Sequence, residues 1–62
     1  MNDIRQDMNK VNETIKSCTD TFQLAGAKRL MDAFQIKWNM DPNHDMMIAF
    51  KDLWTYKLIK LT

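Results

Sequence analysis

The chain has 62 residues, of which 45% are hydrophobic and 27% charged, with a formal net charge of +1. One cysteine excludes an intramolecular disulfide, one cysteine with one histidine excludes a zinc cluster, and the near-neutral charge gives no strong field for nucleic acid or anionic membranes. A chain of this length supports one domain, residues 1–62, with a marginal core. We therefore expect a partner chain to supply the missing stability.

The first predicted helix covers about residues 3–17. Asp3, followed three residues later by Gln6, resembles the capping box that starts a helix. The apolar residues of this segment recur at spacings of 4, 3, 4 and 3, which places them on one narrow stripe: Ile4, Met8, Val11, Ile15 and Cys18. Such a seam suits either the other helices of the chain or a second copy of itself.

The second predicted helix covers about residues 20–38, and Asp20 with Gln23 repeats the start signal. Gly26 between two alanines predicts a close approach of another helix. Three further residues, Phe22, Ala33 and Ile36, fall off the main stripe. The stripe itself again follows spacings of 3 and 4 and comprises Leu24, Ala27, Leu30, Met31, Phe34 and Trp38.

The seams of the first two segments have different phases, so one continuous helix would have to present two faces to the core. The residues where the phase changes, 17–21, are rich in β-branched and capping types. We expect a break there. The alternative is one long bent helix over residues 3–38, packed against the third segment as a hairpin.

The third predicted helix covers about residues 42–61 and is the most apolar. Asp41 is the expected N-cap and Pro42 the expected first helical residue. On a helical wheel, Lys57 lies within the main apolar face, where it can bury its stem and keep its ammonium group in water. The apolar residues exceed what one face can cover, which predicts a protein-binding surface comprising Met47, Ile48, Tyr56, Leu58 and Ile59.

The spacing Asp41-x-Asn43-x-Asp45 resembles the start of a calcium-binding EF-hand loop. However, Met46 stands where that loop needs glycine, and Pro42 occupies its second position. Acidic residues in a first helical turn are also favoured by the helix dipole. We therefore interpret these residues as helix caps and expect no metal site.

No combination of residues indicates catalysis. Cys18 falls on the apolar seam, and nothing in the sequence places it beside His44. A single glycine excludes phosphate-binding glycine loops. A chain this small also has little room for a substrate pocket. We expect no enzyme activity, no catalytic residue and no cofactor.

Two other partner classes are less favoured. The nine lysines and arginines are spread among acidic residues instead of gathering on one helix. An accessory role with nucleic acid therefore requires a dimer that gathers basic residues across its axis. Trp54, Tyr56, Lys57 and Lys60 suit a membrane-surface helix, but the same segment also makes a bundle core. No apolar run is long enough to span a bilayer.

Together these features predict an all-α domain of three helices that assembles as a helical-bundle dimer, covering the surplus apolar residues of the third helix. We expect a non-enzymatic protein-binding module (an adaptor, inhibitor or regulator) that docks through helical apolar surfaces. Its alternative is a nucleic-acid-associated accessory protein. A lone cysteine and the absence of an export signal indicate the cytoplasm.

Overall fold

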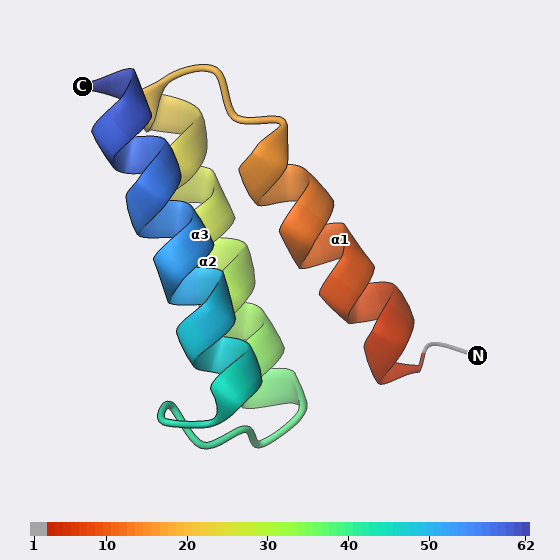
Figure 1. Ribbon diagram of the computed structural model, residues 1–62. Coiled ribbons are helices and arrows are strands. Elements are labelled where there is room, and N and C mark those ends of the chain that lie inside the picture. The colour runs from red at the N-terminus through yellow and green to blue at the C-terminus, as the bar shows by residue number, and fades with distance from the viewer. Residues whose placement is uncertain (1–2) are drawn as a thin grey trace.

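The computed structural model describes residues 3–62, which form three helices and no strand. The helices are α1 (Ile4–Lys16), α2 (Thr21–Lys37) and α3 (Asp45–Leu61). In Figure 1, α2 and α3 lie side by side and run in opposite directions, while α1 runs the same way as α3 and inclines away from it towards its amino end. The predicted three-helix, all-α architecture is confirmed.

Two N-caps were predicted correctly. Asp3 Oδ1 accepts a hydrogen bond from the Gln6 amide at 3.1 Å, and Asp20 Oδ1 accepts one from the Gln23 amide at 2.8 Å. Each bond satisfies a backbone donor that has no partner within the helix. Residues 17–20 lie between α1 and α2, so the predicted break is confirmed and the single bent helix is excluded.

The carboxyl end of α2 closes with a Schellman motif. Asn39 has a φ angle of 48°, in the left-handed region that asparagine tolerates better than most residues. The Met40 amide donates to the Gln35 carbonyl at 2.9 Å, and the Asn39 amide donates to the Ile36 carbonyl at 3.2 Å. These bonds satisfy two of the last helical carbonyls and turn the chain towards α3.

The predicted start of α3 was wrong by three residues. Asp41 and Pro42 lie in the loop, and the N-cap is His44, whose Nδ1 accepts a hydrogen bond from the Met46 amide at 3.1 Å. Asp41 Oδ1 instead accepts a bond from the Asn43 amide at 2.8 Å, and its carbonyl accepts one from the His44 amide. This local Asx turn keeps the Asp41 side chain from capping a helix at residue 42.

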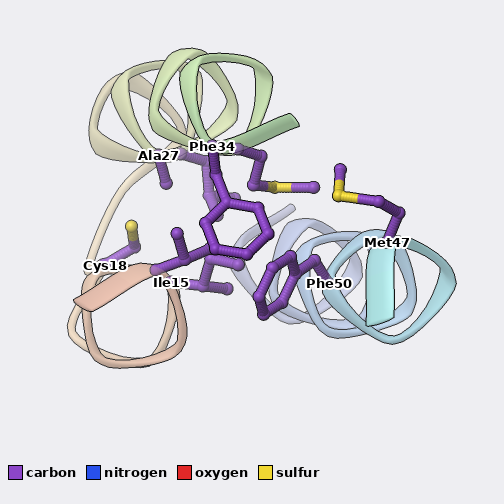
Figure 2. Close-up of a cluster of buried hydrophobic side chains, with 9 residues drawn as sticks. Ile15, Cys18, Ala27, Phe34, Met47 and Phe50 are labelled. Atoms are coloured by element: carbon purple, nitrogen blue, oxygen red, sulfur yellow. The ribbon is translucent and has the colours of Figure 1, made fainter. Parts of the chain in front are cut away.

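Side chains from all three helices, and Cys18 from the loop after α1, fill one core (Figure 2). At its centre the rings of Phe34 and Phe50 meet edge to face. Ile4 and Met8 are partly buried and pack against the core. The apolar stripe of α1 therefore packs against the other helices of the same chain. The buried residues are Val11, Ile15, Cys18, Leu24, Ala27, Met31, Phe34, Met47 and Phe50.

No other helix within residues 3–62 makes the close approach predicted at Gly26. Gly26 is exposed, and a Cβ atom added there would meet no atom within 4 Å. Of the three small residues at this point only Ala27 is buried. Residues 25 and 26 point away from α1 and α3, because the buried side of α2 is set by its larger apolar residues.

Two polar contacts tie α3 to the beginning of α2 and the loop before it. Trp54 Nε1 donates to the Leu24 carbonyl at 2.7 Å. Lys57 Nζ donates to the Cys18 carbonyl at 3.2 Å, so the ammonium group binds a loop carbonyl instead of lying wholly in water as predicted. None of the helices in residues 3–62 is both long and apolar enough to cross a membrane.

Candidate protein-docking surface

Three of the predicted docking residues lie on the outer side of α3. The exposed fraction is 43% for Ile48, 55% for Tyr56 and 68% for Ile59. They are exposed because the opposite side of α3, around Phe50, is turned into the core. We call Ile48, Tyr56 and Ile59 the α3 strip.

The other two predicted docking residues do not belong to this strip. Met47 is 1% exposed and forms part of the core, so it offers no free surface for docking in this structure. Leu58 is half-buried and packs against the core from α3. Both belong to the side of α3 that faces the rest of the chain, where burial against α1 and α2 already uses their apolar surface.

The α3 strip is not a continuous apolar patch. Tyr56 and Ile59 are three residues apart and therefore neighbours on the helix surface, whereas Ile48 lies two turns earlier. Exposed Asp52 and Thr55 lie between them. Lys60 Nζ lies 5.0 Å from the centre of the Tyr56 ring, a cation–π contact that places a positive charge at the carboxyl end of the strip.

A second exposed apolar surface lies on α2 and was not predicted as a site. The side chain of Phe22 is 90% exposed and that of Ile36 is 80% exposed, more than any residue of the α3 strip. Between them lie only small residues and one arginine on the same side of the helix. We call this set the α2 outer face: Phe22, Ala25, Gly26, Arg29, Ala33 and Ile36.

The sequence does contain a signal for the α2 outer face. Phe22, Arg29 and Ile36 recur every seven residues, and the small residues fall at the intermediate steps of three or four. Phe22 and Ile36 lie off the main apolar stripe of α2, so that stripe does not indicate them as a docking surface. Whether another element covers such a face depends on where α1 and α3 pack.

The most developed polar cluster joins α1 to the end of α2. Asp7 Oδ2 accepts hydrogen bonds from Lys37 Nζ at 2.7 Å and from Trp38 Nε1 at 2.8 Å. The bond from Lys37, followed by that from Trp38, lowers the pKa of the Asp7 carboxyl below its usual value of 3.8. Asp7 thus links α1 to the carboxyl end of α2.

The residues considered for catalysis and metal binding are separated or occupied. Cys18 is 3% exposed, and its Sγ donates to the Thr14 carbonyl at 3.1 Å. His44 caps α3 from the loop before it, and that loop lies at the end of the bundle opposite the loop between α1 and α2 (Figure 1). Within residues 3–62, no three His, Cys, Asp or Glu side chains come together in an arrangement that could hold a metal ion.

Small grooves lie between the helices of residues 3–62. One, of about 240 Å³, lies between α2 and α3 over Met31 and Met47, with Lys28 and Lys51 at its edges. Another, of about 160 Å³, lies between α1 and α2 beside the Asp7–Lys37 ion pair. Both are smaller than small-molecule sites, which usually enclose about 300–1,000 Å³. The exposed helix faces are therefore the stronger candidates for a functional surface.

Comparison with protein-family models, with curated proteins and with solved structures finds no match to this chain.

Proposed function

We propose that this chain is a small protein-binding module that self-associates and docks other proteins through helical apolar surfaces. The observation that carries the proposal is the exposure of five large apolar side chains on two outer helix faces: Phe22, Ile36, Ile48, Tyr56 and Ile59. Single exposed apolar residues are ordinary, but side chains aligned along one helix face are typical of protein–protein contacts.

The α3 strip is the proposed docking surface for a different protein. It combines an amphipathic aromatic residue, Tyr56, with two isoleucines, and aromatic side chains are enriched in protein interfaces. Its apolar residues lie along one side of a rigid helix, the arrangement used when a helix packs into a partner's groove. The free, buried thiol of Cys18 accords with action in a reducing compartment such as the cytoplasm.

The test is affinity capture from lysate with the intact chain and with the double variant Ile48→Asp/Ile59→Asp. Introduced charges are costly in a dry interface unless they are paired. We expect partners captured by the parent to fall at least about tenfold with this variant, as measured by quantitative mass spectrometry. A control, Gln6→Asp/Asn9→Asp, adds acidic groups at two exposed positions of α1 and should retain them.

If Ile48→Asp/Ile59→Asp captures partners as well as the control Gln6→Asp/Asn9→Asp does, docking through the α3 strip is contradicted. Nuclease treatment of the lysate tests whether captured partners are held through nucleic acid. Partners lost on that treatment would indicate nucleic-acid association instead, as would binding to random DNA that weakens steeply between about 50 and about 200 mM salt.

A further inference from the structure

The α2 outer face has a nearly symmetric pattern about Arg29, in which Gly26 is the residue whose counterpart, Asp32, is of a different type. Large apolar residues stand at its ends, Phe22 and Ile36, and Arg29 stands midway between them. Ala25 and Ala33 are each four residues from the centre. The ends are 14 residues apart in one helix, a distance of about 21 Å at 1.5 Å per residue.

We propose that a second copy of this chain docks on the α2 outer face, with the two α2 helices antiparallel about a two-fold axis at Arg29. A two-fold contact requires one surface that is complementary to its own rotated copy. In this register Phe22 meets Ile36 of the second copy, and Ala25 meets its Ala33. The small side chains leave room for the two Arg29 side chains, which face each other at the axis, and both exposed apolar ends become covered.

The charges of α2 suit the same register. Asp32 is exposed at the edge of the face, three residues after Arg29. Across the axis, Arg29 of one copy lies about 4.5 Å along the helix from Asp32 of the other, since each residue advances 1.5 Å. The long arginine side chains can turn away from each other, each towards the aspartate of the other copy.

The α3 strip is less suited to pairing with itself. Aligning Ile48 with Ile59 of a second copy would place the axis between residues 53 and 54. The two Asp52 carboxylates would then lie close to the axis, and their short side chains cannot turn away from each other. Each Asp52 would be opposite Thr55 of the other copy and about 4.5 Å along the helix from the second Asp52, and like charges this close repel each other. The second copy is therefore assigned to α2, which leaves the α3 strip free for another protein.

The contact is one helix wide, so it buries less than the roughly 1,200–2,000 Å² typical of stable complexes. We expect a weak dimer that forms as concentration rises. This inference shares the self-association of the proposed function, but it does not depend on docking through the α3 strip.

The first experiment is sedimentation equilibrium of the whole chain from about 10 µM to about 1 mM, since dimer formation follows mass action. The apparent mass should rise from 7.4 kDa towards twice that value. Phe22→Ala/Ile36→Ala should raise the dimer dissociation constant at least about tenfold. The matched control, Ile48→Ala/Ile59→Ala, should leave it unchanged. All four side chains are exposed, so each variant should fold like the parent.

Loss of the dimer in the α3 variant but not in the α2 variant would overturn the assignment while leaving self-association intact. A parent chain that stays monomeric throughout would overturn the assignment and the self-association together. Docking of another protein on the α3 strip would still be judged by the capture experiment.

The second experiment tests the antiparallel orientation. Ala25→Cys and Ala33→Cys are combined in one chain that also carries Cys18→Ala, and the protein is oxidised mildly. The new cysteines are about 12 Å apart along their own helix, too far for a bridge within one chain. Cleavage after lysine and arginine separates them into the peptides 17–28 and 30–37. We expect disulfides joining one peptide type to the other. Bridges between identical peptides, or no bridges, would overturn the antiparallel arrangement.

Discussion

Phe50 on α3 meets Phe34 on α2 edge to face, with ring centroids 5.3 Å apart and ring planes at 83°. Both side chains are almost fully buried, at 2% and 3% exposure. This geometry is one of the two that aromatic pairs prefer, because the positive edge of one ring meets the negative face of the other. The pair therefore ties the two most apolar helices together at the centre of the bundle (Figure 2).

Phe50→Ala should destabilise the fold by about 3–5 kcal/mol, the usual cost of removing a buried aromatic side chain. A domain of this size has little stability to lose, so its cooperative unfolding transition should disappear. Thermal and urea unfolding followed by circular dichroism measure this. Phe22→Ala is the matched control, because Phe22 is 90% exposed and its removal should leave the monomer's stability nearly unchanged. A melt for Phe50→Ala within a few degrees of the parent would contradict the core assignment.

Gly26→Ala should stabilise the monomer by about 0.5–1 kcal/mol, because alanine restricts the unfolded chain and favours the helix. Gly26 lies inside α2 without a positive φ angle, and its added Cβ would meet nothing within 4 Å. Urea unfolding at low protein concentration measures the change apart from any dimer. The reverse substitution at an exposed α2 position, Ala33→Gly, should destabilise by a similar amount. A destabilised Gly26→Ala variant would mean that the site is not open.

Asp7 should make the free energy of unfolding depend on pH in the acid range. Its pKa is lowered in the folded state by Lys37 and Trp38, so its stabilising contribution is present above the unfolded value near 3.8 and is lost as pH falls through the folded pKa. Asp7→Asn should remove this part of the acid destabilisation. Urea unfolding at neutral pH and below the folded pKa tests it.

The Asp7 carboxyl can also be titrated directly by NMR. Its midpoint should lie below 3.8 in the parent and move up towards 3.8 in Lys37→Gln, because the main cause of the lowered pKa is the Lys37 hydrogen bond. Identical midpoints in the two proteins would mean that the ion pair does not form in solution.

Calcium should not bind at the Asp41–Asp45 loop in the micromolar range. Asp41 Oδ1 already accepts the Asn43 amide, and Met46 belongs to α3 where an EF-hand loop needs a glycine turn. Isothermal titration calorimetry should show no one-to-one binding. A clear one-to-one isotherm that disappears in Asp41→Asn would overturn this expectation.

Local features of this protein could be predicted because they depend on neighbours in the sequence. The caps at Asp3 and Asp20 each need only a side-chain oxygen three residues before a free amide. The stripes that contain Ile15 and Phe34 need only helical periodicity. The start of α3 was misplaced because Asp41 can serve either a turn or a helix, and its sequence suits both.

How far each helix face is covered was decided by the tertiary structure. Met47 and Ile48 are adjacent in sequence and similarly apolar, yet one is 1% exposed and the other 43%. Likewise Phe22 lies two residues from fully buried Leu24 but remains 90% exposed. Periodicity groups residues on a face, but the directions from which α1 and α3 approach α2 decide which face is buried, because burial requires a second surface in contact with the first.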